Sequence, residues 1–174
     1  AVLVTNHHQV GTGFFRGRKH HLHEGGIRVP AIVRLPGVVR AGTVTAAPVT
    51  SLDFFPTIAA LCGAPLPTDR AIDGADLGAL LRGGAAPAAR PFYWALPTKT
   101  GLDFAYREGD WKLLLNTEQK PVELYDLSRD PLELTNRLAA EPALAAALAA
   151  AFRAHHAAVV ADPLRPAGMN QTNY

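Results

Sequence analysis

The chain has 174 residues, 48% of them apolar and 18% charged, with a formal net charge of +2 and a single cysteine. This apolar fraction can bury a core, which excludes a mainly disordered chain, and one cysteine excludes an intramolecular disulfide framework or a cysteine-rich zinc module. Because positive and negative charges nearly balance, the composition gives no case for nucleic acid as a partner.

The first part of the chain predicts two strands joined by a long polar loop. Residues 1–5 and 29–35 are short apolar runs, as in buried strands. Residues 6–26 between them contain five glycines and five histidines, and a long loop of this kind is usually functional or disordered. A sequence that opens within a strand is expected to belong to a longer fold.

A helix is predicted over residues 51–63, where a proline suits the first turn and a glycine ends the apolar pattern. Its predicted apolar face consists of Ile58, Leu61 and Cys62. The thiol of Cys62 is therefore expected to be buried and unreactive. Residues 76–81 predict a short helical turn, and the Ala/Pro-rich stretch 84–91 predicts a boundary between two structural parts.

The pattern changes after residue 90, where short apolar segments alternate with turns. This alternation predicts an antiparallel meander over residues 92–127. A helix is predicted from about residue 142 to residue 160. Its apolar stripe consists of Leu144, Leu148, Phe152 and Val159. The stripe favours packing against a core over a membrane anchor, so no membrane span is predicted.

The loop over residues 6–26 concentrates the reactive side chains. Three cations lie beside glycines in this loop: Arg16, Arg18 and Lys19. Such cations can donate charge-assisted hydrogen bonds to an oxyanion, and the alternative is a solvated basic loop that binds nothing. His21, His23 and Glu24 could instead hold a metal ion, although their spacing matches no recognised zinc motif. Spacing alone therefore indicates an oxyanion-binding loop on an α/β scaffold.

A longer motif in the same region resembles a known family. Residues 16–30 read R-G-R-K-H-H-L-H-E-G-G-I-R-V-P, which is similar to the sulfatase pattern R-G-x-K-x-x-x-x-E-G-G-x-R-x-P. Further similar segments follow in the order of that family, at residues 51–57, 73–77, 109–113 and 123–127. The resemblance covers residues 1 to about 160 and is nearest to the arylsulfatase and N-acetylgalactosamine-6-sulfatase type.

The resemblance implies an α/β fold class. The chain would be the C-terminal part of an alkaline-phosphatase-like domain, followed by a small antiparallel sheet packed with a C-terminal helix. The expected domains are residues 1–86 for the α/β part and residues 87–165 for the antiparallel subdomain, with a tail over residues 166–174. The partner that this arrangement implies is the missing N-terminal half of the same fold.

The activity implied by the resemblance is hydrolysis of sulfate esters on a sulfated small molecule or glycan, in a periplasmic or secreted protein. The family converts a Cys or Ser into a formylglycine nucleophile and uses a calcium ion. Lys19 matches the motif lysine, so the resemblance implies that it is catalytic and contacts both the sulfate and the leaving oxygen. Arg16 is the second residue expected to bind substrate, and Asn6 is the expected metal ligand.

The chain departs from the sulfatase pattern at the nucleophile. Its one cysteine, Cys62, is followed by Leu66 where the motif requires an arginine. Most metal-ligand aspartates are also missing, so the chain alone is expected to be inactive. Two alternatives stay open, namely a phosphoesterase or phosphonate hydrolase of the same superfamily and a non-catalytic remnant that binds oxyanions.

Overall fold

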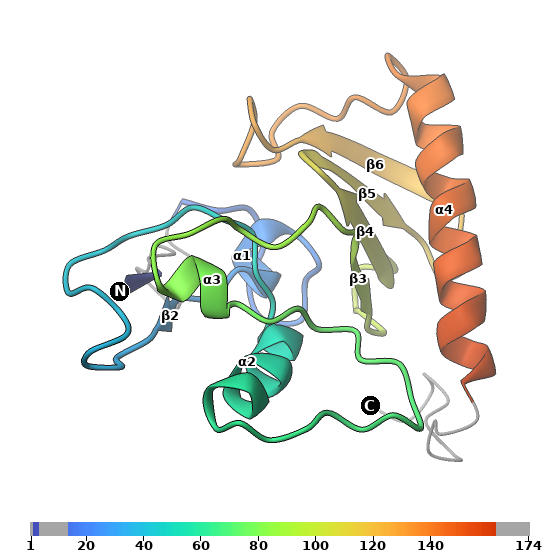
Figure 1. Ribbon diagram of the computed structural model, residues 1–174. Coiled ribbons are helices and arrows are strands. Elements are labelled where there is room, and N and C mark those ends of the chain that lie inside the picture. Colours follow the sequence, from blue (N-terminus) through green and yellow to red (C-terminus); the bar gives the residue numbers. More distant parts are fainter. Residues whose placement is uncertain (1, 4–13, 163–174) are drawn as a thin grey trace. The chain divides into compact units, whose positions relative to one another are not determined.

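The computed structural model describes residues 2–3 and 14–162 (Figure 1). These residues form two compact units, of which the first contains residues 2–3 and 29–89 and the second contains residues 14–28 and 90–162. Residue 89 is the last residue of the first unit, and the chain enters the second unit at residue 90. The predicted domain boundary after residue 86 stays a prediction, and the predicted tail over residues 166–174 lies outside the described residues.

Two short strands open the first unit. β1 (Val2–Leu3) and β2 (Ala31–Ile32) pair antiparallel, with Val2 opposite Ile32. A strand was expected in both places, and β2 is shorter than the predicted run over residues 29–35. Pro30 stands directly before β2 and has no N–H to donate, so it cannot extend the ladder on that side.

The helices of the first unit are fixed by two buried polar side chains. They are the 3-10 helix η1 (Ser51–Asp53), α2 (Phe54–Leu61) and α3 (Gly78–Leu81). The buried Asp53 carboxylate accepts hydrogen bonds from the backbone N–H of Thr50 and of Ala75, each at 2.8 Å. The Thr57 hydroxyl accepts one from the backbone N–H of Leu77, also at 2.8 Å. The side chains of the motif segment 51–57 therefore bond to the backbone of the motif segment 73–77, which accounts for the Asp and Thr in the first of them.

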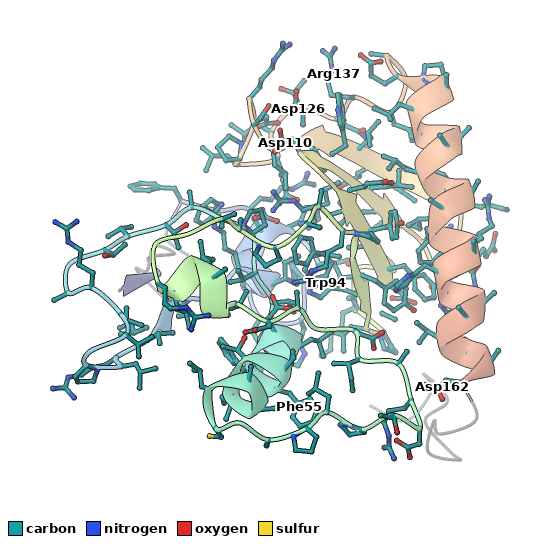
Figure 2. All side chains as sticks on the ribbon, in the orientation of Figure 1. Phe55, Trp94, Asp110, Asp126, Arg137 and Asp162 are labelled. Carbon is teal, nitrogen blue, oxygen red and sulfur yellow. The ribbon has the colours of Figure 1, made fainter. Side chains whose placement is uncertain are left out.

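The predicted apolar face of α2 is wrong. Ile58 is 59% exposed, and Leu61 and Cys62 are exposed as well, so the expectation of a buried thiol is also wrong. The buried residues of α2 are Pro56, Thr57 and Ala59. The hydrogen bonds of Asp53 and Thr57 hold the Thr57 side of the helix inward and leave the apolar side outside. Figure 2 labels Phe55, another of these apolar side chains, which is 53% exposed.

The second unit contains the predicted meander. Its strands are β3 (Phe92–Ala95), β4 (Phe104–Glu108), β5 (Trp111–Leu115) and β6 (Pro121–Asp126), and they lie in the order β3-β4-β5-β6. Every neighbouring pair is antiparallel. The tight turn between β4 and β5 places Glu108 opposite Trp111 and uses Gly109 at φ +58°, a conformation that favours glycine. The meander is therefore confirmed.

The last helix, α4 (Pro142–Ala161), covers one face of this sheet (Figure 1). By length and composition α4 could cross a membrane, but Leu148 and Phe152 are buried against the sheet. Their partners include Phe104, Tyr106, Leu113, Leu115 and Leu124. The predicted packing of the stripe is thus confirmed at these two residues, whereas Val159 lies near the end of the helix and is exposed.

The opposite face of the sheet is covered by residues 14–28. Period-two alternation along the strands turns Ala105, Leu114 and Tyr125 away from α4, and Leu102, which lies just before β4, packs with them. The buried Leu22, two residues before α1 (Glu24–Ile27), packs among these residues. The sheet therefore carries a helix on one face and the motif-bearing loop on the other.

Candidate active-site loop

The predicted catalytic residue lies at an exposed turn of the loop. Arg18, Lys19 and His20 are all exposed, and they follow Gly17, whose φ is +83°. His20 also has a positive φ, +71°, which is uncommon for a residue other than glycine. The His21 N–H closes this turn with a 2.9 Å bond to the Arg18 carbonyl. The backbone thus presents a compact cationic tip with the Lys19 ammonium in reach of solvent.

Two glycines hold this turn against α1. A Cβ on Gly25 would lie 2.6 Å from the carbonyl oxygens of Arg16 and Gly17, and a Cβ on Gly26 would lie 2.0 Å from that of His21. No side chain fits at such distances. The Gly25 N–H donates to the Arg16 carbonyl at 2.7 Å, which fixes the approach. The glycine pair of the motif is therefore required by the close contact of the helix start with the loop backbone.

Arg16, which was expected to bind substrate, is engaged with the sheet. One nitrogen of its guanidinium donates to the Tyr125 hydroxyl and, at 3.1 Å, to the Glu133 carbonyl. The other donates to the Glu123 carboxylate at 3.2 Å. These contacts anchor the loop to β6 and to the segment that follows it. A substrate contact by Arg16 stays a prediction.

A second anchor joins His23 to the same carboxylate. The buried His23 ring lies 2.6 Å from Glu123 through its Nε2, and the Tyr125 hydroxyl donates to Glu123 at 3.0 Å. Burial raises the pKa of Glu123, but these two hydrogen bonds and the nearby positive charges outweigh it and leave that pKa below its ordinary value. Burial and the Glu123 charge raise the pKa of the Tyr125 phenol above its ordinary value.

This lowered pKa predicts acid sensitivity of the anchor. A carboxyl whose pKa is lower in the folded state contributes stability above its unfolded-state pKa, and that contribution is lost as the pH falls through the folded-state pKa. We expect the free energy of unfolding to fall below roughly pH 4.3, and Glu123→Gln to reduce that fall. Urea unfolding from about pH 7 to about pH 3 measures it.

The matched control is Glu118→Gln, because Glu118 is a fully exposed carboxyl whose pKa is lowered by Lys120. Solvent screens such surface pairs, so this variant is expected to keep the pH dependence of the parent chain. An unchanged pH dependence in Glu123→Gln would contradict the prediction.

A third anchor is a group of ion pairs between the loop and the sheet, in which all members except the exposed Arg28 are buried. Lys112 on β5 is fully buried, and its Nζ lies 3.0 Å from Glu24 Oε1 and 2.8 Å from Glu133 Oε1. The backbone N–H of Glu24 donates to Glu133 Oε2 at 2.6 Å, and an Arg28 nitrogen lies 3.6 Å from Glu24 Oε2. Two carboxylates and two cations therefore alternate, which balances the charge.

Sequence reasoning missed Lys112 and Glu133. A lysine inside the apolar run W-K-L-L-L was a usable signal, because an ammonium on a covered sheet face needs a buried partner. Glu133 carried no such signal, since it lies in an irregular segment with φ +57°. Glu24 is part of the sequence motif, and the structure shows its ion pairs with Lys112 and Arg28.

The described residues do not fit a metal site. Within residues 14–162, no three His, Cys, Asp or Glu side chains gather closely enough to hold an ion. The alternative of a metal held by His21, His23 and Glu24 is therefore not found there, since His23 bonds Glu123 and Glu24 pairs with a lysine. Asn6, the predicted metal ligand, lies outside the described residues.

Comparison with protein families agrees with the motif. Residues 11–155 match the family model described as N-sulphoglucosamine sulphohydrolase, C-terminal. Arylsulfatase A of Homo sapiens is 37% identical over 150 residues, which cover 73% of this chain and 29% of that protein. Steryl-sulfatase of Rattus norvegicus is 53% identical over 76 residues, which cover 44% of this chain and 13% of that protein.

Solved structures show the same relationship. The crystal structure of Ps i-CgsB superposes with a TM-score of 0.70 at 30% identity, covering 81% of this chain and 31% of that one. A second structure, BT4656 in complex with its substrate D-glucosamine-2-N,6-O-disulfate, gives a TM-score of 0.59 at 27% identity, covering 77% and 29%. The chain thus spans less than a third of the length of these proteins.

The alkaline-phosphatase-like fold and the motif-bearing loop define a sulfatase-type protein, as the sequence predicted, and hydrolysis of sulfate esters is the activity of that class. Within that class, the chain belongs to the family of the N-sulphoglucosamine sulphohydrolase C-terminal region. The matched region corresponds to the C-terminal portion of its relatives. The activity of a whole relative is therefore not assigned to this chain by the match alone.

Proposed function

We propose that this chain forms the C-terminal part of an enzyme that hydrolyses sulfate esters, and that Lys19 binds the sulfate. The observation that carries the proposal is the difference between the contacts of Lys19 and those of its neighbours in the loop. The neighbouring motif side chains of Arg16, His23 and Glu24 all bond to the sheet unit, whereas the exposed Lys19 lies at the tip that they anchor.

An ammonium in this place suits a sulfate ester. It can donate hydrogen bonds to sulfate oxygens and stabilise the negative charge that develops on the leaving oxygen. The substrate class we propose is a sulfated glycan or a sulfated small molecule. The first choice is supported by BT4656, the structural neighbour whose substrate is a disulfated glucosamine, and the second by the steryl-sulfatase relative.

Formylglycine and calcium belong to the proposal as expectations from the resemblance. Such a group would supply the nucleophile, and the ion would polarise the sulfate. Residues 14–162 contain no cluster that could hold the ion, so we assign no residue of this chain to either role.

The test compares the 174-residue chain with the complete protein that carries it, on p-nitrophenyl sulfate and p-nitrophenyl phosphate. We expect the complete protein to hydrolyse the sulfate ester faster than the phosphate ester, and the chain alone to show no turnover. Faster hydrolysis of the phosphate ester would replace the proposal with a phosphoesterase. No turnover by the complete protein would favour a non-catalytic oxyanion-binding remnant.

A further inference from the structure

We propose that Lys112 is a positioning residue for the loop that carries Lys19. The proposal rests on the proposed function, because Lys112 has no access to substrate and would act through Lys19. Lys112 lies in the middle of the sheet at 0% exposure, whereas Lys19 is exposed on the loop that covers that sheet face.

The charge balance between the two buried carboxylates depends on Lys112. Its single ammonium lies between the carboxylates of Glu24 and Glu133, both of which are buried. Removing the ammonium would leave two carboxylates facing each other out of water, with Arg28 as the remaining partner of one of them. Breaking a buried pair in this way is strongly unfavourable, so α1 would have to move to relieve it.

Movement of α1 would be passed directly to the tip of the loop. Glu24 is the first residue of α1, and the next two residues touch the loop backbone at distances that leave no room for a Cβ. Their carbonyl contacts include Arg16, Arg18 and His21, the residues on both sides of Lys19. The tip can therefore keep its conformation only while α1 keeps its place.

The ion pairs have a directional effect that an apolar contact would lack. The three positions that follow Lys112 on β5 are buried leucines, and apolar side chains in place of Lys112 and both of its carboxylate partners together could contribute as much stability as the ion pairs do. Apolar packing has no preferred direction, whereas the ammonium holds one Glu24 oxygen at 3.0 Å. The ion pairs thus specify the place of α1 rather than only its burial.

A double-mutant cycle in the complete enzyme tests the proposal. Lys112→Met is expected to lower kcat/KM for p-nitrophenyl sulfate roughly 10-fold to 100-fold, as expected for a misplaced catalytic group. In a Lys19→Ala background the same change is expected to cost less than about 3-fold, because the group that it positions is already absent. The matched control is Lys120→Met, an exposed lysine with a surface partner, which should leave kcat/KM unchanged.

An equal loss in both backgrounds would overturn the positioning role and leave Lys112 a purely structural residue. Unchanged kcat/KM in Lys19→Ala itself would overturn the proposed function, and the positioning role with it. Loss in Lys19→Ala without any loss in Lys112→Met would overturn only the inference.

A second measurement covers the case in which Lys112→Met does not fold. Glu133→Gln keeps the size of the side chain and removes one of the two negative charges. Hydrogen exchange of a peptide over residues 14–28 is expected to accelerate in Glu133→Gln, with a peptide over residues 104–115 unchanged. Exchange that rises equally in both peptides, or in neither, would overturn the proposal independently of any activity.

Discussion

Replacing Lys19 with alanine in the complete enzyme is expected to lower kcat/KM for a sulfate ester by roughly 10²-fold to 10³-fold, the usual cost of one donor aimed at developing charge. The fold should be kept, because the exposed ammonium has no place in the three anchors of the loop. Steady-state kinetics, with circular dichroism as a check of folding, measures the effect.

The control for this variant is Lys99→Ala, which removes an exposed lysine far from the loop in sequence. It should retain the parent value of kcat/KM, so that loss of one positive charge from the protein is distinguished from loss of the charge at the tip. A Lys19→Ala enzyme within about 3-fold of the parent would contradict a catalytic role, since one charged donor is worth far more than that.

The largest loss of stability is expected from Phe152→Ala in the middle of α4. Phe152 is fully buried, and its ring lies 5.3 Å from that of Phe104 and 5.9 Å from that of Tyr93, between centroids. Truncating a buried phenylalanine typically costs about 3–5 kcal/mol, through lost burial and the cavity left behind. Urea or thermal unfolding of the chain measures it, with an expected fall in Tm of about 10 °C.

Val160→Ala on the same helix is the matched control, because Val160 is 49% exposed and its truncation leaves no cavity. We expect it to change the free energy of unfolding by less than about 0.5 kcal/mol. A loss below about 1 kcal/mol in Phe152→Ala would mean that α4 does not depend on the sheet for its stability.

The second half of the fold was predictable because its patterns are local. Alternating apolar residues and Gly-containing turns specify a meander, and neighbouring strands then pair in order. The apolar stripe of α4 also predicted correctly that Leu148 and Phe152 pack against the sheet. At α2 the same reasoning failed, because Asp53 and Thr57 outweigh its more apolar side through hydrogen bonds to residues 75 and 77. The periodicity of apolar residues carries no information about such hydrogen bonds.

The candidate site was also predictable only in part from the sequence. The motif marked Lys19, whereas the close backbone contacts that require Gly25 and Gly26 in α1 came from the structure. The partners of the motif could not be derived from spacing, since Glu24 meets Lys112 and Glu133 only after the sheet has formed. A single buried charge in a strand is a signal that sequence analysis can use, whereas a partner in an irregular segment gives none.

The anchors of the loop also have a consequence for synthesis of the protein. They join residues 88 to 117 positions apart, whereas each strand pairs with the next one along the chain. Contacts of long range are the slowest to form. On the ribosome the loop emerges before all its partners, and at about 5–20 residues per second it waits roughly 5–25 s for Glu133. The lysine that we assign to catalysis therefore reaches its working position among the last events of folding.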